Sequence, residues 1–308
     1  MSNGPILIGG LDRSGKTLMR LSLSAHPRIA MTRRTYMWTR FYGRYGDLGR
    51  RENFERCLAA MLRHPPTQLL QPDAARIRQE FWQGAPTYAR LFALVHQHHA
   101  ERLGRPRWGD QLGDVERYAD AIFAAYPDAR MIHMIRDPRE RYAAATPPAQ
   151  RRLGKAGVAM ARWLASLALA ERNRQRYPGR YMVVRYELLV AQRAATLRAV
   201  CACIGEPFVP QMVTLEGAMR FGDDPADDAD AQPLAPLSAR ETLFIERYAG
   251  RVMRAWGYQP GTVRLELRER LTFTLIDWPA NLARAAAWRA REALKYGGEG
   301  LREGRALP

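Results

Sequence analysis

The residues most suggestive of chemistry lie close to the N-terminus. Gly10 to Thr17 read GLDRSGKT and match the P-loop pattern G-x-x-x-x-G-K-[ST] without a mismatch. A glycine-rich turn at the start of a helix presents unpaired backbone N–H groups and a positive dipole end to an anion. The segment therefore predicts a phosphate-binding loop. It leaves open which phosphate compound binds there and whether that compound is ATP.

A second anion-binding residue follows another apolar segment. Met131–Ile135 (MIHMI) is expected to be a buried strand, and Arg136 is the first polar residue after it. An ATPase or GTPase places a metal-binding Asp at such a strand end, whereas an arginine attracts an anion. We find no other apolar strand that ends in Asp. The sequence thus predicts two anion sites, the loop Arg13–Leu18 and Arg136, and no metal site. A nucleotide with phosphates at its 5′ and 3′ positions would occupy both.

The elements that position these residues alternate along the chain. Short apolar runs predict strands at Pro5–Gly10, Met131–Ile135 and Tyr181–Arg185, with helices between them, and Arg107–Asp110 (RWGD), which is not an apolar run, is a candidate for a short strand or a strand end. This alternation predicts an α/β fold of the P-loop NTPase-like, three-layer α/β/α type with a central parallel sheet. Residues 1–260 are expected to form one domain, in which 35–105 are a helical insertion on the acceptor side. Residues 261–308 are expected to form a C-terminal helical extension.

Composition narrows the setting of the protein. The chain has 308 residues, is 47% hydrophobic and carries a formal net charge of +17, almost all of it from arginine. It contains no apolar run of about eighteen residues and no signal-peptide pattern, so we expect a cytoplasmic protein. The positive charge favours anionic partners, but no nucleic-acid-binding motif is visible, and we do not expect a nucleic-acid partner.

Three motifs in order resemble those of the PAPS-dependent sulfotransferases, whose donor is 3′-phosphoadenosine 5′-phosphosulfate. They are Arg13–Leu18 (RSGKTL), Arg136–Arg139 (RDPR) at the end of an apolar strand, and Val184–Val190 (VRYELLV). The resemblance covers about residues 4–210. Within the family, the sequence is most similar to the branch that contains the bacterial and tyrosylprotein sulfotransferases. The implied activity is in-line transfer of a sulfuryl group to an acceptor hydroxyl without a metal.

The resemblance also implies roles for residues. The donor's 5′-phosphosulfate would be held by Arg13, Ser14, Gly15, Lys16, Thr17 and Leu18. Arg136 would pair with the 3′-phosphate, and Tyr186 would lie near the nucleotide or be an ordinary core tyrosine. Lys16 and Arg13 would stabilise charge on the leaving 3′,5′-adenosine bisphosphate. Lys16 stands where the family commonly has threonine, so a kinase or ATPase using Mg-ATP stays an alternative.

The general base is harder to assign, because the sequence departs from the family pattern. Asp110 matches the acidic residue of the family's W-G-E-K segment and is the predicted base, while Gln111 replaces its lysine. Arg34 stands where the tyrosylprotein branch has glutamate, and Ala144 replaces a serine that usually helps to bind the 3′-phosphate. Substitutes for that serine could come from Thr146, Arg139, Arg151 and Arg152. These departures leave a non-catalytic nucleotide-binding relative as a further alternative.

The acceptor and the remaining surfaces are less readable. Candidate acceptors are a glycan, a lipid-linked sugar, a peptide tyrosine and a small natural product, with residues 35–105 and the acidic loop 222–236 as the expected pocket. Arg33, Arg34 and Arg40 would suit an acidic acceptor.

Two further segments have competing interpretations. His96, His98 and His99 are expected on a solvated helix surface rather than at a metal. The basic helix Pro279–Tyr296 is expected to serve packing, oligomer contact, or peripheral membrane contact through Trp278 and Trp288.

Overall fold

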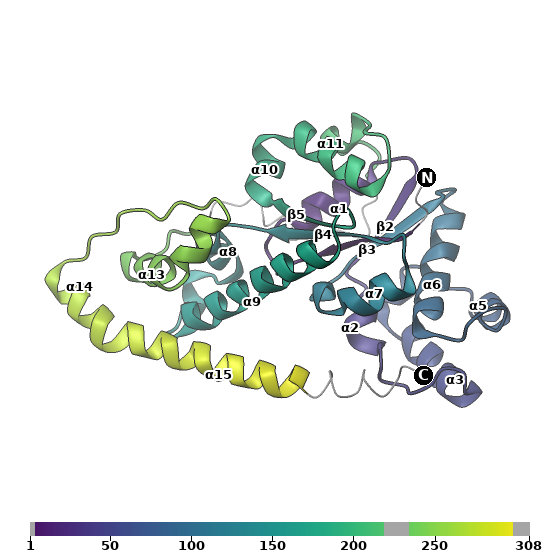
Figure 1. The fold of residues 1–308 in the computed structure, drawn as a ribbon, viewed down its shortest axis with the longest axis horizontal. Helices are drawn as coiled ribbons and strands as arrows, with labels where there is room; N and C mark the ends of the chain where they lie inside the picture. The colour runs from purple at the N-terminus through teal and green to yellow at the C-terminus, as the bar shows by residue number, and fades with distance from the viewer. Residues whose placement is uncertain (1–3, 219–233, 298–308) are drawn as a thin grey trace. The chain divides into compact units, whose positions relative to one another are not determined.

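A parallel sheet organises the first of two compact units of the chain. The computed structural model describes residues 4–218 and 234–297. Unit 1 comprises Met1–Ile135 and Leu169–Asp230, and unit 2 comprises Arg136–Ala168 and Ala231–Pro308. Figure 1 shows the strands of unit 1 between helices.

Within the described residues the sheet of unit 1 has five strands in the order β2-β3-β1-β4-β5, and every pair is parallel. On the central strand β1, Leu7 is in register with Asp110 of β3 and with Met131 of β4. The carboxyl ends of all strands therefore meet at one edge, where parallel sheets place their ligands. The predicted α/β fold with a central parallel sheet is confirmed. The strands are β1 (Ile6–Gly9), β2 (Ile29–Arg33), β3 (Arg107–Gln111), β4 (Arg130–Ile135) and β5 (Tyr181–Arg185).

Successive side chains of the strands point to opposite faces of the sheet and pack into two hydrophobic cores. Leu7 belongs to one cluster with the helices α2, α3, α5, α6 and α7, while Ile6 and Ile8 belong to the other cluster with α1, α11 and α12. Figure 1 shows α10 and α11 on one side of the strands and α6 and α7 on the other. The helices of this unit are α1 (Lys16–Ser24), α2 (Met37–Phe41), α3 (Arg51–Leu62), α4 (Pro65–Gln68), α5 (Ala74–Phe81), α6 (Tyr88–Arg102), α7 (Ala119–Ala125), α10 (Tyr186–Ala191), α11 (Arg193–Ile204) and α12 (Gln211–Thr214).

Strand β2 is not predicted from the sequence. It follows the helix stop at His26-Pro27 almost at once, and its five residues include a threonine and an arginine. Pairing with β3 from Ile29 to Arg33 supplies the stability that the local pattern lacks. Residues 35–105, which the sequence predicts to be helical, contain α2 to α6, and Pro65 stands at the first position of α4.

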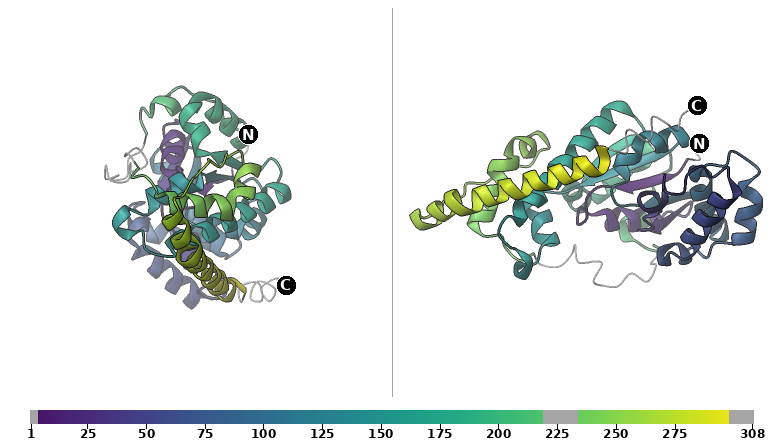
Figure 2. Two further views of the ribbon diagram at one scale, coloured as in Figure 1. Left: turned by 90° about the vertical axis from the view of Figure 1, so that its left-hand side faces the viewer. Right: turned by 90° about the horizontal axis from the view of Figure 1, so that it is seen from below.

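Unit 2 is helical. It contains α8 (Pro138–Ala145), the first part of α9 (Lys155–Arg176), α13 (Ala239–Ala255), α14 (Leu267–Thr272) and α15 (Trp278–Gly297). A π-helical segment, Phe273–Asp277 (η4), joins α14 to α15, so the three run on as one long helix, drawn in yellow in Figure 2. Most of the acidic loop at 222–236 lies outside the described residues, and its part in the acceptor pocket stays a prediction.

Candidate functional site

The P-loop segment connects β1 to α1 as its pattern predicts. Gly10 has φ +105° and Gly15 has φ +87°, values that L side chains rarely adopt. A Cβ on Gly10 would lie 2.2 Å from the carbonyl oxygen of Met134, and one on Gly15 would lie 2.2 Å from Cδ2 of Tyr186. The Tyr186 ring therefore packs directly on the loop, and glycine is required at both positions.

The remaining residues of the loop continue into the first turn of α1. Arg13 takes a left-handed conformation with φ +64°, and the Ser14 hydroxyl donates to the carbonyl of Leu11 at 2.6 Å. Thr17 and Leu18 are half-buried in the first turn of the helix. The loop thus directs its backbone toward the positive end of a nine-residue helix, which is suited to a phosphate.

Lys16 is folded back onto the loop. Its Nζ donates to the carbonyl oxygen of Gly10 at 2.6 Å and lies 3.6 Å from a carboxylate oxygen of Asp12. The side chain is 6% exposed, and burial lowers the pKa of the ammonium, while the nearby carboxylates of Asp12, Glu116 and Asp114 raise it. An ammonium has three hydrogens, so these contacts leave capacity for a phosphate oxygen.

Two charged residues lie near Lys16, of which Glu116 is not predicted from the sequence, while Arg34 is predicted as a residue suited to an acidic acceptor. Glu116, in the short helix η1 (Val115–Tyr118), accepts a hydrogen bond from the backbone N–H of Gly10 at 3.2 Å and is 1% exposed. Arg34 lies close enough to lower the pKa of Lys16 by its charge. No motif in the sequence includes Glu116. It reaches the loop only because the 3-10 helix η1 places its side chain beside Gly10.

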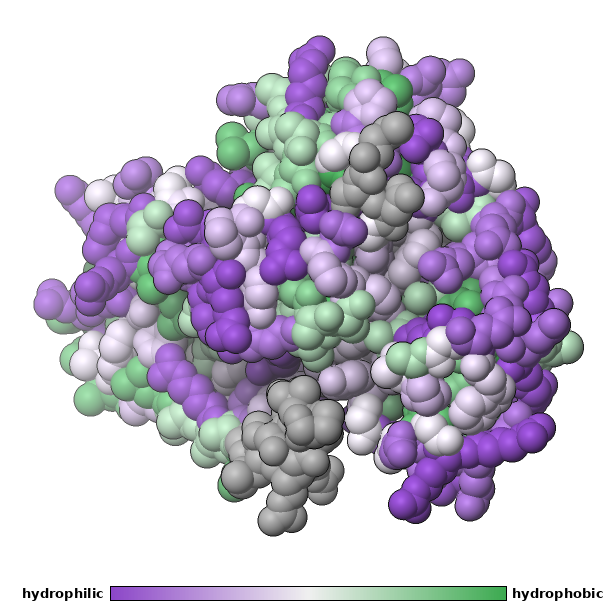
Figure 3. All heavy atoms as spheres, turned by 45° about the vertical axis from the view of Figure 1, so that its right-hand side comes forward, coloured by the Kyte–Doolittle hydropathy of each residue, from purple (hydrophilic) through white to green (hydrophobic). Residues whose placement is uncertain are grey.

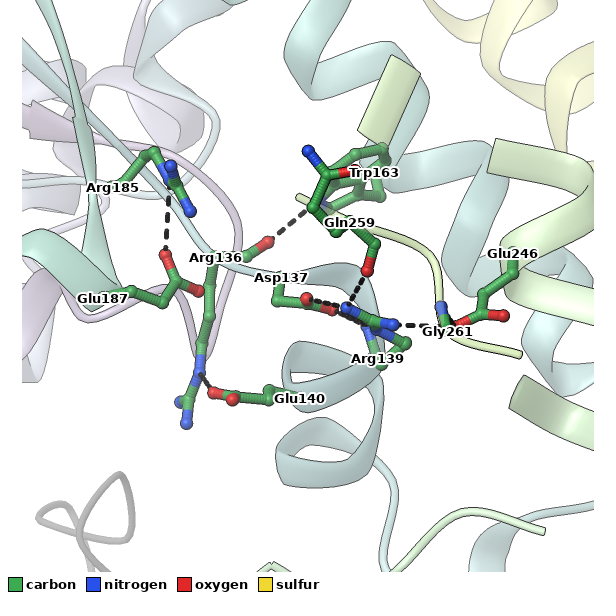
Figure 4. Close-up of polar contacts among 10 residues, drawn as sticks. All are labelled: Arg136, Asp137, Arg139, Glu140, Trp163, Arg185, Glu187, Glu246, Gln259 and Gly261. Carbon is green, nitrogen blue, oxygen red and sulfur yellow. Dashed lines mark hydrogen bonds and ion pairs between the residues drawn. The ribbon is translucent and has the colours of Figure 1, made fainter. Parts of the chain in front are cut away.

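Arg136 follows β4 directly and begins unit 2. Its Nε lies 3.3 Å from a carboxylate oxygen of Glu140, and its carbonyl accepts from Trp163 Nε1 at 3.0 Å. Figure 4 shows the Arg136 side chain directed toward Glu140. The Arg136 side chain is 4% exposed and that of Glu140 is 51% exposed. A bound phosphate would compete with this half-exposed carboxylate for the guanidinium.

The candidate substitutes for the serine missing at Ala144 differ in how they are engaged. Arg139 donates to Asp137 at 2.6 Å and to Glu246 at 2.7 Å, as Figure 4 shows. Arg151 donates to the carbonyls of Thr146, Ala235 and Pro236. Both guanidinium groups therefore cross-link unit 2 through contacts that a phosphate would have to displace.

A cavity of about 650 Å³ lies in unit 2, and exposed Arg152 is part of its lining. Arg240 and Asp277 also line it, and they pair with each other at 2.7 Å. Tyr142 in the wall donates to Glu241 at 3.2 Å. Several polar groups of this wall are thus paired with one another.

Asp110 lies on β3 and is fully buried. Its Oδ2 accepts a hydrogen bond from the Thr35 hydroxyl and lies 3.3 Å from His96 Nε2. The other oxygen, Oδ1, has no hydrogen-bond partner among the described residues. His96 Nδ1 lies 2.9 Å from the carbonyl of Phe92, which only accepts, so Nδ1 carries a hydrogen. Thr35 and His96 thus both engage the same carboxylate oxygen of Asp110.

The prediction of solvated histidines is wrong. His96, His98 and His99 are 0%, 2% and 4% exposed on α6. His98 Nε2 lies 2.8 Å from a carboxylate oxygen of Glu80, and burial lowers the pKa of His99 to about 4. Phe92 and His96 are four residues apart and therefore lie on the same face of α6. Because Phe92 is expected in the core, this spacing also predicts that His96 is buried. Over residues 4–218 and 234–297 no group of three potential ligands could hold a metal.

Comparison with known proteins identifies the fold and the family. The profile of the sulfotransferase family matches residues 5–210. The sulfotransferase domain of the Synechococcus PCC 7002 olefin synthase is 20% identical, with a TM-score of 0.50 over 80% of this chain and 94% of that chain.

Two further solved structures are similar. The sulfotransferase domain of the curacin biosynthetic pathway is 16% identical, with a TM-score of 0.49 over 88% of this chain and 97% of that chain. The sulfotransferase STF9 of Mycobacterium avium is 13% identical, with a TM-score of 0.48 over 85% and 79%. A search of curated proteins finds no match. The match over residues 5–210 covers most of the chain, which therefore belongs to the sulfotransferase family, a class of PAPS-dependent transferases.

Proposed function

We propose that this protein transfers the sulfuryl group of PAPS to an acceptor hydroxyl by metal-independent in-line transfer, with 3′,5′-adenosine bisphosphate as the product. The observation that carries the proposal is the loop at the end of β1. There two glycines with positive φ, the Tyr186 ring and a buried Lys16 form a cradle for a phosphate in a member of this family. The residues present fit the phosphosulfate end of the donor.

The loop residues divide the binding of the donor between them. Arg13, Ser14, Gly15, Lys16, Thr17 and Leu18 would hold the 5′-phosphosulfate through backbone N–H groups and the two cations. Tyr186 would fix the loop by packing on Gly15. Arg136 would pair with the 3′-phosphate, for which a guanidinium is geometrically suited.

PAPS, when bound, supplies a sulfuryl group whose bond to the 5′-phosphate breaks as a bond to the acceptor oxygen forms. Negative charge then develops on the leaving phosphate. Lys16 and Arg13 would stabilise that charge, and Lys16 can do so because Gly10 engages only one of its three hydrogens. The protein's contribution is thus mainly positioning and electrostatic stabilisation.

Asp110 is our proposed general base. Thr35 and His96 engage its Oδ2, which leaves Oδ1 as the carboxylate atom available to the acceptor's proton. Because the side chain is fully buried, this role requires the acceptor hydroxyl, or one bridging water, to enter beside Oδ1. Asp110 shares a sheet face with Leu7, whose core cluster includes helices of residues 35–105. We therefore propose that insertion as the acceptor side.

The proposal of an acidic acceptor rests on Arg34 alone, since Asp12, Glu116 and Asp114 near Lys16 carry negative charge. Arg34 acts on the pKa of Lys16, so its guanidinium lies within electrostatic reach of the proposed transfer site. It would attract an acceptor that carries carboxylate, phosphate or sulfate groups. We propose a cytoplasmic location and no nucleic-acid partner, as expected from the composition.

The deciding experiment is thermal stabilisation by 3′,5′-adenosine bisphosphate, compared with ADP and ATP with and without Mg²⁺. We expect a higher Tm with the bisphosphate alone, a loss of that shift in Arg136→Ala, and no loss in the control Arg251→Ala, which removes an exposed arginine of α13. A rise in Tm with Mg-ATP only would contradict the proposal and would indicate a kinase or ATPase. Bisphosphate binding without transfer of labelled sulfuryl to any candidate acceptor would favour a non-catalytic relative.

A further inference from the structure

The long C-terminal helix of unit 2 has one face fixed by packing. Phe273 and Ala285 are buried on that face, and the Asn281 side chain accepts from the backbone N–H of Gly157 at 2.6 Å. Trp278 packs against Phe244 and Phe273 with ring centroids 5.4 Å and 5.8 Å apart. Trp278 therefore faces its own unit, so its indole is not a free membrane anchor as the sequence suggested.

The opposite face of this helix is apolar and exposed. Leu267, Leu271 and Leu275 follow one another at four-residue spacing and lie on one side of the helix. With Ile276 and Leu294 their exposed fractions run from 51% to 83%. Exposed alanines continue the face along α15 at positions Ala283, Ala286, Ala287, Ala290 and Ala293.

This face differs from the ordinary apolar content of a protein surface. Figure 3 shows hydrophobic areas interspersed with hydrophilic side chains on the face it draws, and such scatter needs no explanation. On the C-terminal helix, by contrast, large aliphatic side chains recur on one side of a single element. A contiguous exposed apolar face of this kind marks an interaction site.

The charges beside this face indicate its partner. Along α15 the exposed cations Arg284, Arg289, Arg291 and Lys295 outnumber the one acidic residue, Glu292. A second copy of the chain would bring the same excess of positive charge against itself, which costs free energy. Anionic lipid headgroups would instead meet the arginines while the leucines enter the acyl boundary.

We propose that the exposed face of Leu267–Gly297 binds the surface of an anionic phospholipid bilayer, with the helix lying in the plane of the headgroups. Spanning is not implied, because in the described parts of the chain no helix is both long and apolar enough to cross a membrane. The inference is independent of the proposed transfer reaction, because it rests only on contacts and charges within unit 2.

The test uses the full chain and vesicles of phosphatidylcholine with or without phosphatidylglycerol, separated by flotation. We expect binding to the anionic vesicles, weakened at high salt. The double variant Leu271→Glu/Leu275→Glu should bind at least tenfold more weakly, and Arg284→Gln/Arg291→Gln about tenfold more weakly. The matched control Leu69→Glu changes a leucine of unit 1 that is 55% exposed and should bind as the unchanged protein does.

Three results would overturn the proposal. They are no binding to anionic vesicles, equal binding to neutral vesicles, and a dimer in light scattering that only the leucine variants dissociate, which would assign the face to a second copy. Far-UV circular dichroism shows whether each variant is folded. Thermal stabilisation by the bisphosphate separates a failure here from a failure of the proposed transfer function.

Discussion

Replacing Gly15 with alanine tests the contact between the P-loop and Tyr186. An alanine at φ +87° costs about 1–2 kcal/mol for the left-handed conformation alone. Its Cβ would lie 2.2 Å from the Tyr186 ring, whereas carbon atoms pack at about 3.5–4.0 Å. The ring must therefore retreat by more than about 1 Å, and overpacking of this kind costs a further ~1–3 kcal/mol. We expect Gly15→Ala to lower the free energy of unfolding by about 2–5 kcal/mol.

A double-mutant cycle separates the two terms. In a Tyr186→Ala background the steric term disappears, so Gly15→Ala should cost only about 1–2 kcal/mol. The coupling free energy between the two positions is then about 1–3 kcal/mol, measured by urea unfolding followed by circular dichroism. Additivity within about 0.5 kcal/mol would refute the contact. Calorimetric titration with the bisphosphate should also show weaker binding to Gly15→Ala, because the displaced ring no longer fixes the loop.

Three further predictions concern buried ionisable groups. Asp110→Asn should lower kcat by about 10²–10⁴ with any acceptor found, while the Kd for the bisphosphate is unchanged; a purely structural Asp110 would instead lower stability and leave kcat intact. The pKa of His99 is lowered to about 4, so between pH 6.5 and 4 the unfolded chain binds more protons than the folded one. Stability should therefore fall by up to roughly 3 kcal/mol as the pH drops through this window, and urea unfolding of His99→Gln should show a smaller fall. Burial also lowers the pKa of Lys16, so the folded chain loses this proton below pH 10.5, where the unfolded chain still holds it. Stability should rise with pH in that alkaline window; Lys16→Met should lack the rise and should also lose transfer activity, and an identical pH profile of the two proteins would contradict the burial of the ammonium.

The local sequence pattern is sufficient to predict an element where a single short segment contains all the residues that determine it. The apolar runs at β1, β4 and β5 and the glycines of the loop are readable because period, length and turn residues agree over a few positions. Strand β2 was missed because its short, mixed sequence becomes a strand only by pairing with β3. The order of the strands rests on the same long-range pairing, which no local pattern encodes.

The surroundings of the proposed base could not be predicted, because they come from three separate parts of the chain. Thr35 follows β2, His96 lies on α6 and Asp110 lies on β3. Only the packing of α6 against the sheet brings them together, and no spacing in the sequence encodes that contact. The burial of His96 is predictable from its position on the apolar stripe of its helix, although the polarity of the imidazole favours a surface position.

The π-helical turn at Phe273–Asp277 has a consequence for how much length variation this helix tolerates. In an uninterrupted α-helix, eight residues rotate by about 80° beyond two full turns, which would separate Phe273 from Asn281. A π turn absorbs one extra residue, and the remaining seven positions return to within about 20° of alignment, so both side chains are buried on one face. The π turn thus restores the rotational alignment between the buried side of Phe273 and the buried side of α15. Deleting one residue within it would rotate α15 by about 100° relative to α14 and turn buried Asn281 and Ala285 outward. At this point of the chain the number of residues is constrained more strictly than their identity.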